Sequence, residues 1–179
     1  MSEKVKAEIS VWLEKAQERL EKDKGLRTVM KRAAGKNMAA AGGSAIAGFY
    51  KLPLVSYREE VCFDVICLMC LWEVDEWKRG ESLAIAAKRC VPVERRDAFG
   101  KKLETLLDLS IDEDGYFQAK LFRIVKYIQS NGAVIDAAQL LYDLMYWEGD
   151  THFIQKRWVK EFYQGAKEDE SEGEVENVD

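Results

Sequence analysis

The 179-residue chain has few of the residues that interrupt helices and few of those that build common catalytic sites. Its only prolines are Pro53 and Pro92, so long segments can stay helical. The only histidine is His152, which argues against a catalytic triad and a histidine-rich metal site. Residues 42–44 are Gly-Gly-Ser, but no Lys-Ser/Thr pair follows them, as a phosphate loop would require. These absences favour a helical protein and give no positive ground for catalysis or for a bound cofactor or metal.

Long hydrophobic runs and a secretion signal are also missing. The apolar run Val65–Trp72 is far shorter than the roughly 20 residues that cross a bilayer. Met1–Lys24 is charged throughout, so we expect no signal peptide. The four cysteines lie in or next to apolar stretches, which is typical of reduced thiols: Cys62, Cys67, Cys70 and Cys90. We therefore expect a cytoplasmic protein without a membrane partner.

Acidic and basic residues are unevenly distributed along the chain, whose formal net charge is −5 at pH 7. Seven of the 32 acids lie in Glu168–Asp179, which contains no base. The other 25 acids are set against 27 bases, so the rest of the chain has a net charge of +2. An acidic segment of this kind is usually disordered. The sequence therefore predicts a weakly basic folded part and a disordered acidic tail over residues 167–179.

The stretch Tyr57–Trp72 (YREEVCFDVICLMCLW) is the expected centre of the fold. Between Val61 and Trp72 only Asp64 is charged. A helix that is apolar on nearly every side must be surrounded by other helices. We therefore predict a buried core helix. Asp64 should lie at its rim or find a partner, because a buried unpaired carboxylate is costly.

Hydrophobic periodicity predicts helices over most of the remaining chain. Ser82 and Asp136 are expected to cap two of them, and Gly132 should follow the last turn of a third. The predicted helices cover Glu3–Lys22, Leu26–Gly35, Leu83–Cys90, Val93–Leu109, Tyr116–Asn131, Ala137–Trp147 and Thr151–Gln164. With no convincing strand, the fold class is all-α, as two packed helical bundles without significant sheet.

Three connecting segments complete the predicted organisation. Asn37–Lys51 is rich in glycine and alanine and forms either a close-packed helix or a mobile loop. Glu73–Ser82 is polar and is expected to be a loop. Asp108–Gly115 combines acidic residues with a glycine and is the predicted domain boundary. It separates an N-terminal bundle over residues 1–109 from a C-terminal bundle over residues 110–166.

The basic residues of the folded part occur in clusters, and two long segments contain no acid, residues 24–57 and 115–135. Exposed clusters of one sign favour an anionic partner, and phosphate backbones bind such clusters without base readout. Tyr116 and Tyr127 could stack on unpaired bases. The clusters are Lys24/Arg27/Lys31/Arg32, Lys88/Arg89, Arg95/Arg96/Lys101/Lys102 and Lys120/Arg123/Lys126. From helical facing we select Arg27, Lys31, Lys88 and Lys126 as candidate contacts to nucleic acid.

Cys67 and Cys70 form a CxxC motif, which raises the alternative of a zinc or redox site. A structural zinc site needs two further ligands, and a redox motif belongs at an exposed, electropositive helix start. Here the motif lies inside the most apolar helix. We therefore interpret both cysteines as core residues and place a zinc enzyme far below the other hypotheses.

Four short motifs, in order, resemble the CasB family, the small subunit of the type I-E CRISPR Cascade complex. Residues 30–33 (MKRA) resemble its N-terminal basic pair and precede an FYxL-like segment at 49–52 (FYKL). Residues 80–84 (GESLA) are similar to its GxSLG segment, and residues 121–125 (LFRIV) to LRRLL. Residues 140–147 and 158–162 (WVKEF) resemble its closing LxxxLxxW and W-x3-F patterns. The resemblance covers about Lys24–Tyr163, and its specificity comes from the order and spacing of the motifs.

The resemblance implies an all-helical, non-enzymatic protein that acts in antiviral defence. It implies two copies docked on the other Cascade subunits, where basic residues hold the guide RNA, the target DNA and the displaced strand. By position, Arg32 matches the N-terminal basic pair, and Lys101 and Lys102 match the basic pair before the apolar residues of the family's fifth helix. Arg123 matches the second arginine of LRRLL. These four residues complete the predicted nucleic-acid-binding set.

The sequence departs from the family pattern at three positions. Ala84 replaces a glycine, Phe122 replaces the first LRRLL arginine, and Asp108 stands where a base is expected. The last two reduce the positive charge near the predicted domain boundary. The alternative function is therefore a helical protein–protein adaptor whose bases are only solvated and touch no nucleic acid.

Overall fold

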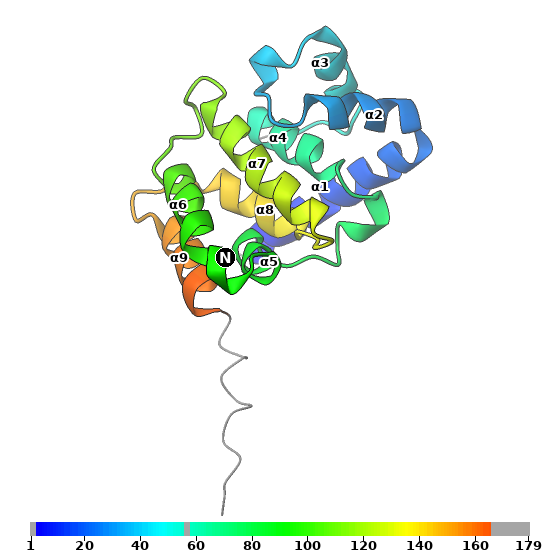
Figure 1. Ribbon diagram of the computed structural model, residues 1–179. Coiled ribbons are helices and arrows are strands. Elements are labelled where there is room, and N and C mark those ends of the chain that lie inside the picture. The colour runs from blue at the N-terminus through cyan, green and yellow to red at the C-terminus, as the bar shows by residue number, and fades with distance from the viewer. Residues whose placement is uncertain (1–2, 56–57, 166–179) are drawn as a thin grey trace, which may run out of the picture.

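The computed structural model describes residues 3–55 and 58–165, and its secondary structure is helical (Figure 1). The α-helices are α1 (Glu3–Lys22), α2 (Lys24–Ala33), α3 (Gly43–Phe49), α4 (Glu59–Met69), α5 (Leu83–Cys90), α6 (Arg96–Leu107), α7 (Tyr116–Ser130), α8 (Ala137–Met145) and α9 (Phe153–Gln164). Short 3₁₀ turns are η1 (Met38–Ala40), η2 (Val74–Glu76) and η3 (Val93–Arg95). In the described ranges the only β-type pairing is an isolated bridge between Glu81 and Ile135. The predicted all-α class without significant sheet is confirmed.

The helix ends follow the predicted caps. Ser82 Oγ accepts a hydrogen bond from the amide of Ile85 at the start of α5. An Asp136 carboxylate oxygen accepts from the amide of Gln139 at 2.6 Å and caps α8. Gly132 has a φ of +80°, a conformation that favours glycine, just beyond α7. Local side-chain chemistry therefore determines these three boundaries.

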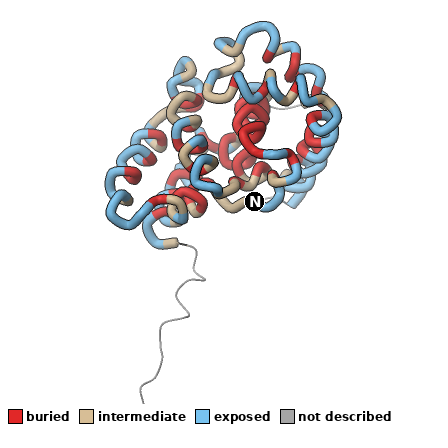
Figure 2. The backbone as a smooth tube through the Cα atoms, turned by 45° about the vertical axis from the view of Figure 1, so that its right-hand side comes forward, coloured by how far each residue is buried: buried red, intermediate tan, exposed pale blue. Residues whose placement is uncertain are grey.

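The stretch around α4 is the core of the molecule, as the sequence predicts. Every residue from Val61 to Trp72 is buried, and Figure 2 shows this helix red and surrounded by other helices. Asp64 is 4% exposed, and one of its carboxylate oxygens accepts a hydrogen bond from Gln118 Nε2 at 3.0 Å. Burial raises the pKa of Asp64 to about 7, although the bond from Gln118 opposes that shift. The predicted partner for this carboxylate therefore exists, and it is a neutral one.

The helices form two packed groups that meet along α4 and α8. Helix α2 packs on α1, α3 and α4, and α8 lies against α1 and α4. Helices α5, α6, α7 and α9 form the second group, with α5 against α9 and α6 against α7. Both groups combine helices from the two sides of residue 109. The division into bundles over residues 1–109 and 110–166 stays a prediction. The predicted tail, residues 167–179, lies outside the described residues.

Two connecting segments are more structured than loops. Within Asn37–Lys51, α3 packs closely on α2: a Cβ added to Gly48 would meet the Leu26 Cδ1 atom at 3.0 Å. Of the two readings of this segment, the close-packed helix is therefore correct. Within Glu73–Ser82, Trp77 is 1% exposed, so a buried tryptophan anchors a segment that looks polar.

In the described part of the chain, no helix combines the length and hydrophobicity needed to cross a membrane.

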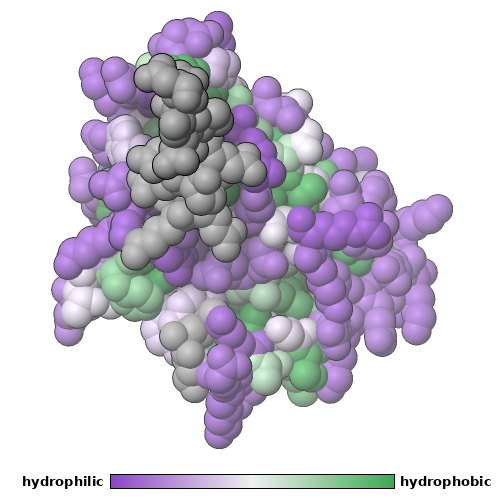
Figure 3. Space-filling model, turned by 90° about the horizontal axis from the view of Figure 1, so that it is seen from below, coloured by the Kyte–Doolittle hydropathy of each residue, from purple (hydrophilic) through white to green (hydrophobic). Residues whose placement is uncertain are grey.

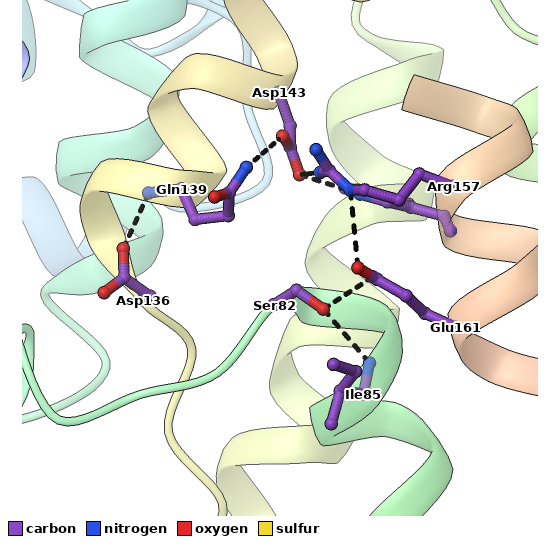
Figure 4. Close-up of polar contacts among 8 residues, drawn as sticks. Ser82, Ile85, Asp136, Gln139, Asp143, Arg157 and Glu161 are labelled. Carbon is purple, nitrogen blue, oxygen red and sulfur yellow. Dashed lines mark hydrogen bonds and ion pairs between the residues drawn. The ribbon is translucent and has the colours of Figure 1, made fainter. Parts of the chain in front are cut away.

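A polar network joins α5 and α9 of the second group to α8 of the first (Figure 4). Asp143 is 1% exposed and forms an ion pair with Arg157, and it also accepts a bond from Trp158 Nε1 at 2.8 Å. Arg157 Nε lies 3.4 Å from Glu161, which accepts a bond from Ser82 Oγ at 2.6 Å. The network fixes α9 against both neighbouring helices.

Candidate nucleic-acid interface

The groove between α6 and α7 collects basic residues that are far apart in the sequence. It encloses about 630 Å³, and Phe99 and Tyr127 contribute to its apolar floor. No acid is found among the described residues that line it. Its five bases are Arg95, Lys101, Lys102, Lys120 and Arg123.

Helical spacing explains why these side chains share one surface. Arg95 is the last residue of η3, directly before α6, and Lys102 follows it by seven residues, so the two lie on one side of the continuous η3–α6 segment. Leu103 and Leu106 are buried on the other side of α6. On α7, Lys120 and Arg123 are three residues apart and therefore neighbours. Because α6 and α7 pack side by side, the two basic faces border one groove.

The charges of the groove are available to a ligand. Within residues 3–55 and 58–165, none of its five bases forms an ion pair with an acid. Lys120 Nζ lies 5.2 Å from the centre of the Tyr116 ring, a cation–π contact that leaves its charge unbalanced. Glu104, on α6, faces away and accepts a hydrogen bond from the Tyr163 hydroxyl. An anion in this groove would therefore meet several bases and no competing carboxylate.

The predicted cluster on α2 differs, because an acid balances part of its charge. Arg27 forms a 2.6 Å ion pair with Glu73 and donates a second bond to the carbonyl of Trp72 at 3.1 Å. The Arg27 hydrogen bond lowers the pKa of Glu73, and the charge of Lys31 lowers it further. Lys31 and Arg32 are exposed. Arg27 is therefore held in place mainly by protein partners.

The structure brings three of the eight predicted site residues together in the groove: Lys101, Lys102 and Arg123. Arg27, Lys31 and Arg32 lie on α2, while Lys88 lies on α5 and Lys126 lies on α7 outside the groove.

The groove also contains Arg95 and Lys120, which belong to the predicted basic clusters but not to the predicted site. Arg95 lies seven residues before Lys102, and Lys120 lies three residues before Arg123. Helical spacing could therefore have placed both residues beside predicted site residues. Tyr127 lines the groove and packs on Phe99 with ring centres 5.2 Å apart. Part of its ring is therefore in contact with the protein and not available to stack on a base.

The departures from the CasB pattern have structural explanations. Phe122 packs on the end of α2, where a Cβ added to Gly35 would lie 2.8 Å from the Phe122 ring. Its apolar side chain therefore connects α7 to α2 where the family has a base. Ala84 is fully buried inside α5, and Asp108 is an exposed residue at the end of α6.

The CxxC cysteines have the properties of core residues. Cys67 and Cys70 are 1% and 0% exposed. Burial raises the pKa of Cys70 to about 12 and the pKa of Cys67 well above its usual range. Reactive thiols have lowered pKa values, whereas the pKa values of these two thiols are raised, as expected of cysteines buried in a core. In the parts of the chain that the structure describes, no group of three or more His, Cys, Asp or Glu residues is placed to hold a metal.

Comparisons with known proteins identify the family. The family model for CRISPR-associated protein Cse2 matches residues 26–163, which is more than half of the chain. No curated protein sequence matches significantly. The crystal structure of CasB from Thermus thermophilus is 22% identical, with a TM-score of 0.64 over 92% of this chain and 99% of that one.

Two further solved structures have the same fold. CasB from Thermobifida fusca is 17% identical, with a TM-score of 0.62 over 90% of this chain and 98% of that one. A chain of a CRISPR RNA-guided surveillance complex is 13% identical, with a TM-score of 0.64 over 90% of this chain and 94% of that one. The relationship that the four motifs predict is thereby confirmed, and the chain belongs to the CRISPR-associated Cse2 family.

Proposed function

We propose that this chain is a non-catalytic small subunit of a type I-E CRISPR Cascade surveillance complex and binds nucleic-acid backbone in the α6/α7 groove. The observation that carries the proposal is a groove with five bases and no acid among its described lining residues. Membership of the Cse2 family and the fold shared with a chain of an RNA-guided surveillance complex support this setting. The setting implies a cytoplasmic protein that acts in antiviral defence.

The groove has chemistry suited to sugar and phosphate and little that could read bases. Arg95 and Lys102 are seven residues apart, which corresponds to about 10 Å along the helix, so the bases form a short positive track. Such a track holds phosphates by charge and counterion release. In a Cascade complex, pairing with the guide RNA reads the sequence, so a protein subunit needs only to support the backbone. The groove would thus stabilise the guide–target hybrid or the displaced strand.

The predicted residues outside the groove contribute differently in this proposal. Lys31 and Arg32 on α2, with Lys88 and Lys126, provide secondary contacts to a strand that extends beyond the groove. Arg27 contributes least, because Glu73 balances its charge. Other Cascade subunits and a second copy of this chain are the proposed protein partners.

The test is the salt dependence of binding to a single-stranded oligonucleotide and to a duplex of unrelated sequence. Each phosphate contact adds about 0.7–0.9 to the slope of log affinity against log salt. Replacing Lys101, Lys102 and Arg123 by alanine should therefore lower the slope by about 2–3 units and leave helicity unchanged. Equal binding of two unrelated sequences would support backbone recognition.

A matched variant controls for the loss of three charges as such. Lys4, Lys15 and Lys22 are exposed on α1 and outside the groove. Their replacement by alanine removes the same charge and should change the slope by less than about one unit. Equal slopes for the two triple variants would reject the groove as the binding site. No binding even at low salt, together with copurification of a protein partner, would favour the adaptor function.

A further inference from the structure

The acidic segment 166–179 follows Gly165, which lies beside Lys88. The last described residue, Gly165, ends α9, and a Cβ added to it would lie 2.6 Å from Lys88 Nζ. Three residues after Lys88, Val91 already lines the groove. Gly165 therefore lies beside a lysine that is three residues from the groove in sequence. Figure 3 shows the underside of the molecule, which is largely hydrophilic where described residues are visible.

The end of α9 packs on α6, and these contacts fix the position from which the acidic segment extends. Phe162 stacks on Phe99 with ring centres 5.7 Å apart, and Phe99 is itself a lining residue of the groove. The Tyr163 hydroxyl donates a 2.9 Å hydrogen bond to Glu104 and lies against Gly100. These contacts hold the end of α9 against α6, the helix that carries Lys101 and Lys102.

The length and the charge of the segment both suit the groove. Fourteen residues extend at most about 50 Å, several times the roughly 10 Å between Arg95 at the end of η3 and Lys102 on α6. The segment has seven acids and one base, Lys167, whereas the groove has five bases and no acid among its described lining residues. The α2 cluster is a poorer match, because Glu73 already balances Arg27 there.

We propose that residues 166–179 occupy the α6/α7 groove of the free protein and compete there with nucleic acid. The competition rests on the proposed function, whereas the contact between segment and groove does not. A covalently attached anion competes at high effective concentration with weakly bound, adventitious nucleic acid. A strand that is already positioned by partner subunits would displace it. The segment thus acts as a selectivity device that keeps the unassembled subunit from binding nucleic acid.

The contact is tested without nucleic acid, by backbone amide chemical shifts of the full chain and of a chain ending at Gly165. At low salt, the amides of Arg95, Lys102 and Lys120 should differ between the two chains, and about 0.5 M salt should abolish the difference because the Debye length falls to a few ångströms. A full chain in which the seven acids of residues 166–179 are changed to Asn or Gln should give the same amide shifts as the shortened chain. Shift differences confined to the end of α9 would overturn the proposal.

Two further controls identify the occupant. In the full chain with Lys101, Lys102 and Arg123 replaced by alanine, the tail-dependent shifts at Arg95 and Lys120 should disappear. The triple variant of Lys4, Lys15 and Lys22 should keep them. Shifts that weaken on dilution would mean that the segment enters the groove of a second copy, which would overturn the intramolecular contact.

Binding measurements then separate this proposal from the proposed function. Loss of residues 166–179 should raise affinity for a single-stranded oligonucleotide on the order of tenfold at low salt and make the salt slope steeper, because nucleic acid no longer displaces a bound anion. Identical affinities and slopes for both chains would overturn the competition and leave the proposed function standing. Altered groove amides without nucleic-acid binding by either chain would overturn the proposed function and leave the contact standing.

Discussion

Arg123 on α7 and Arg157 on α9 differ in what surrounds their charge. Arg157 forms ion pairs with Asp143 and Glu161, and Asp143 also accepts bonds from Trp158 and from Gln139. Arg123 is exposed in the α6/α7 groove and has no acidic partner in the described part of the chain. One arginine joins helices, and the other leaves its charge available to a ligand.

The difference shows why a count of basic residues cannot identify a binding surface. What matters is whether a carboxylate comes within reach when the helices pack. On α9 one acid lies four residues after the arginine and another lies on the facing helix α8, so the charge is balanced twice. Where α6 meets α7, α7 contains no acid, and neither Asp97 nor Glu104 of α6 lines the groove. The bases of the groove therefore have no acidic partner in the described part of the chain.

Arg157→Ala should have the largest effect on stability. It would leave Asp143, which is 1% exposed, as a buried carboxylate without its counter-charge. Breaking a buried ion pair in this way costs about 3–5 kcal/mol. Urea unfolding followed by circular dichroism measures the loss.

Arg123→Ala is the matched control on the other side of the comparison. It removes an exposed arginine from a helix surface, and it should change the free energy of unfolding by less than about 0.5 kcal/mol. It should lower the salt slope of nucleic-acid binding by about 0.7–0.9. If Arg157→Ala and Arg123→Ala lowered the free energy of unfolding by similar amounts, the contrast between a paired and an unpaired arginine would be wrong.

Asp64 sharpens the comparison, because it is a buried carboxylate with a neutral partner. Its folded-state pKa is raised to about 7 from a usual value of 3.8, mainly by burial and in part by the charge of Glu60. The folded state therefore binds more protons than the unfolded state between these values, and this contribution to stability is lost as pH rises through 7. Compared with Asp64→Asn, the wild-type chain should lose roughly 2–4 kcal/mol between pH 4 and pH 8.

The difference between the two chains isolates this group from the other buried acids. Burial also raises the pKa values of Asp143 and Glu161, and they contribute equally to both chains. Asp150→Asn changes an exposed carboxyl and serves as the control, with an expected difference below about 0.5 kcal/mol across the range. A pH-independent difference for Asp64→Asn would mean that this carboxyl is solvated in the folded state.

The sequence predicts what depends on local periodicity and capping. The limits of α1, the core stretch around α4 and the caps Ser82 and Asp136 follow from spacing and from side chains within a few residues. They need no knowledge of how the helices pack.

The sequence could not predict features that depend on packing between distant segments. The Arg27–Glu73 pair joins residues 46 positions apart, and Trp77 is buried within a segment that looks polar. Periodicity places Arg95 and Lys120 on exposed faces, but only the packing of α6 on α7 puts them in one groove. The three groove residues Lys101, Lys102 and Arg123 were predicted through the family resemblance, which contains information about packing.

Arg27→Ala tests a predicted site residue whose charge is balanced by protein. The substitution removes the hydrogen bonds to Glu73 and to the carbonyl of Trp72, so a cost of about 1 kcal/mol is expected in urea unfolding. The salt slope of binding should change by less than about half a unit. Lys31→Ala, one turn further along α2 and exposed, should show the reverse, a lower slope at unchanged stability. A large change in the salt slope for Arg27→Ala would show that this residue does contact nucleic acid.

Ala98→Glu should have as small an effect on stability as Arg123→Ala and would introduce one carboxylate into the groove. Ala98 lines the groove three residues after Arg95 and four before Lys102, so the new carboxylate would be a helical neighbour of both bases. The salt slope should fall by about one contact, or about 0.9, while unfolding changes by less than about 0.5 kcal/mol. Ala98→Gln has nearly the same shape and no charge, and should keep the slope. If the groove binds nucleic acid because carboxylates are absent, then one carboxylate there must weaken binding without removing any base.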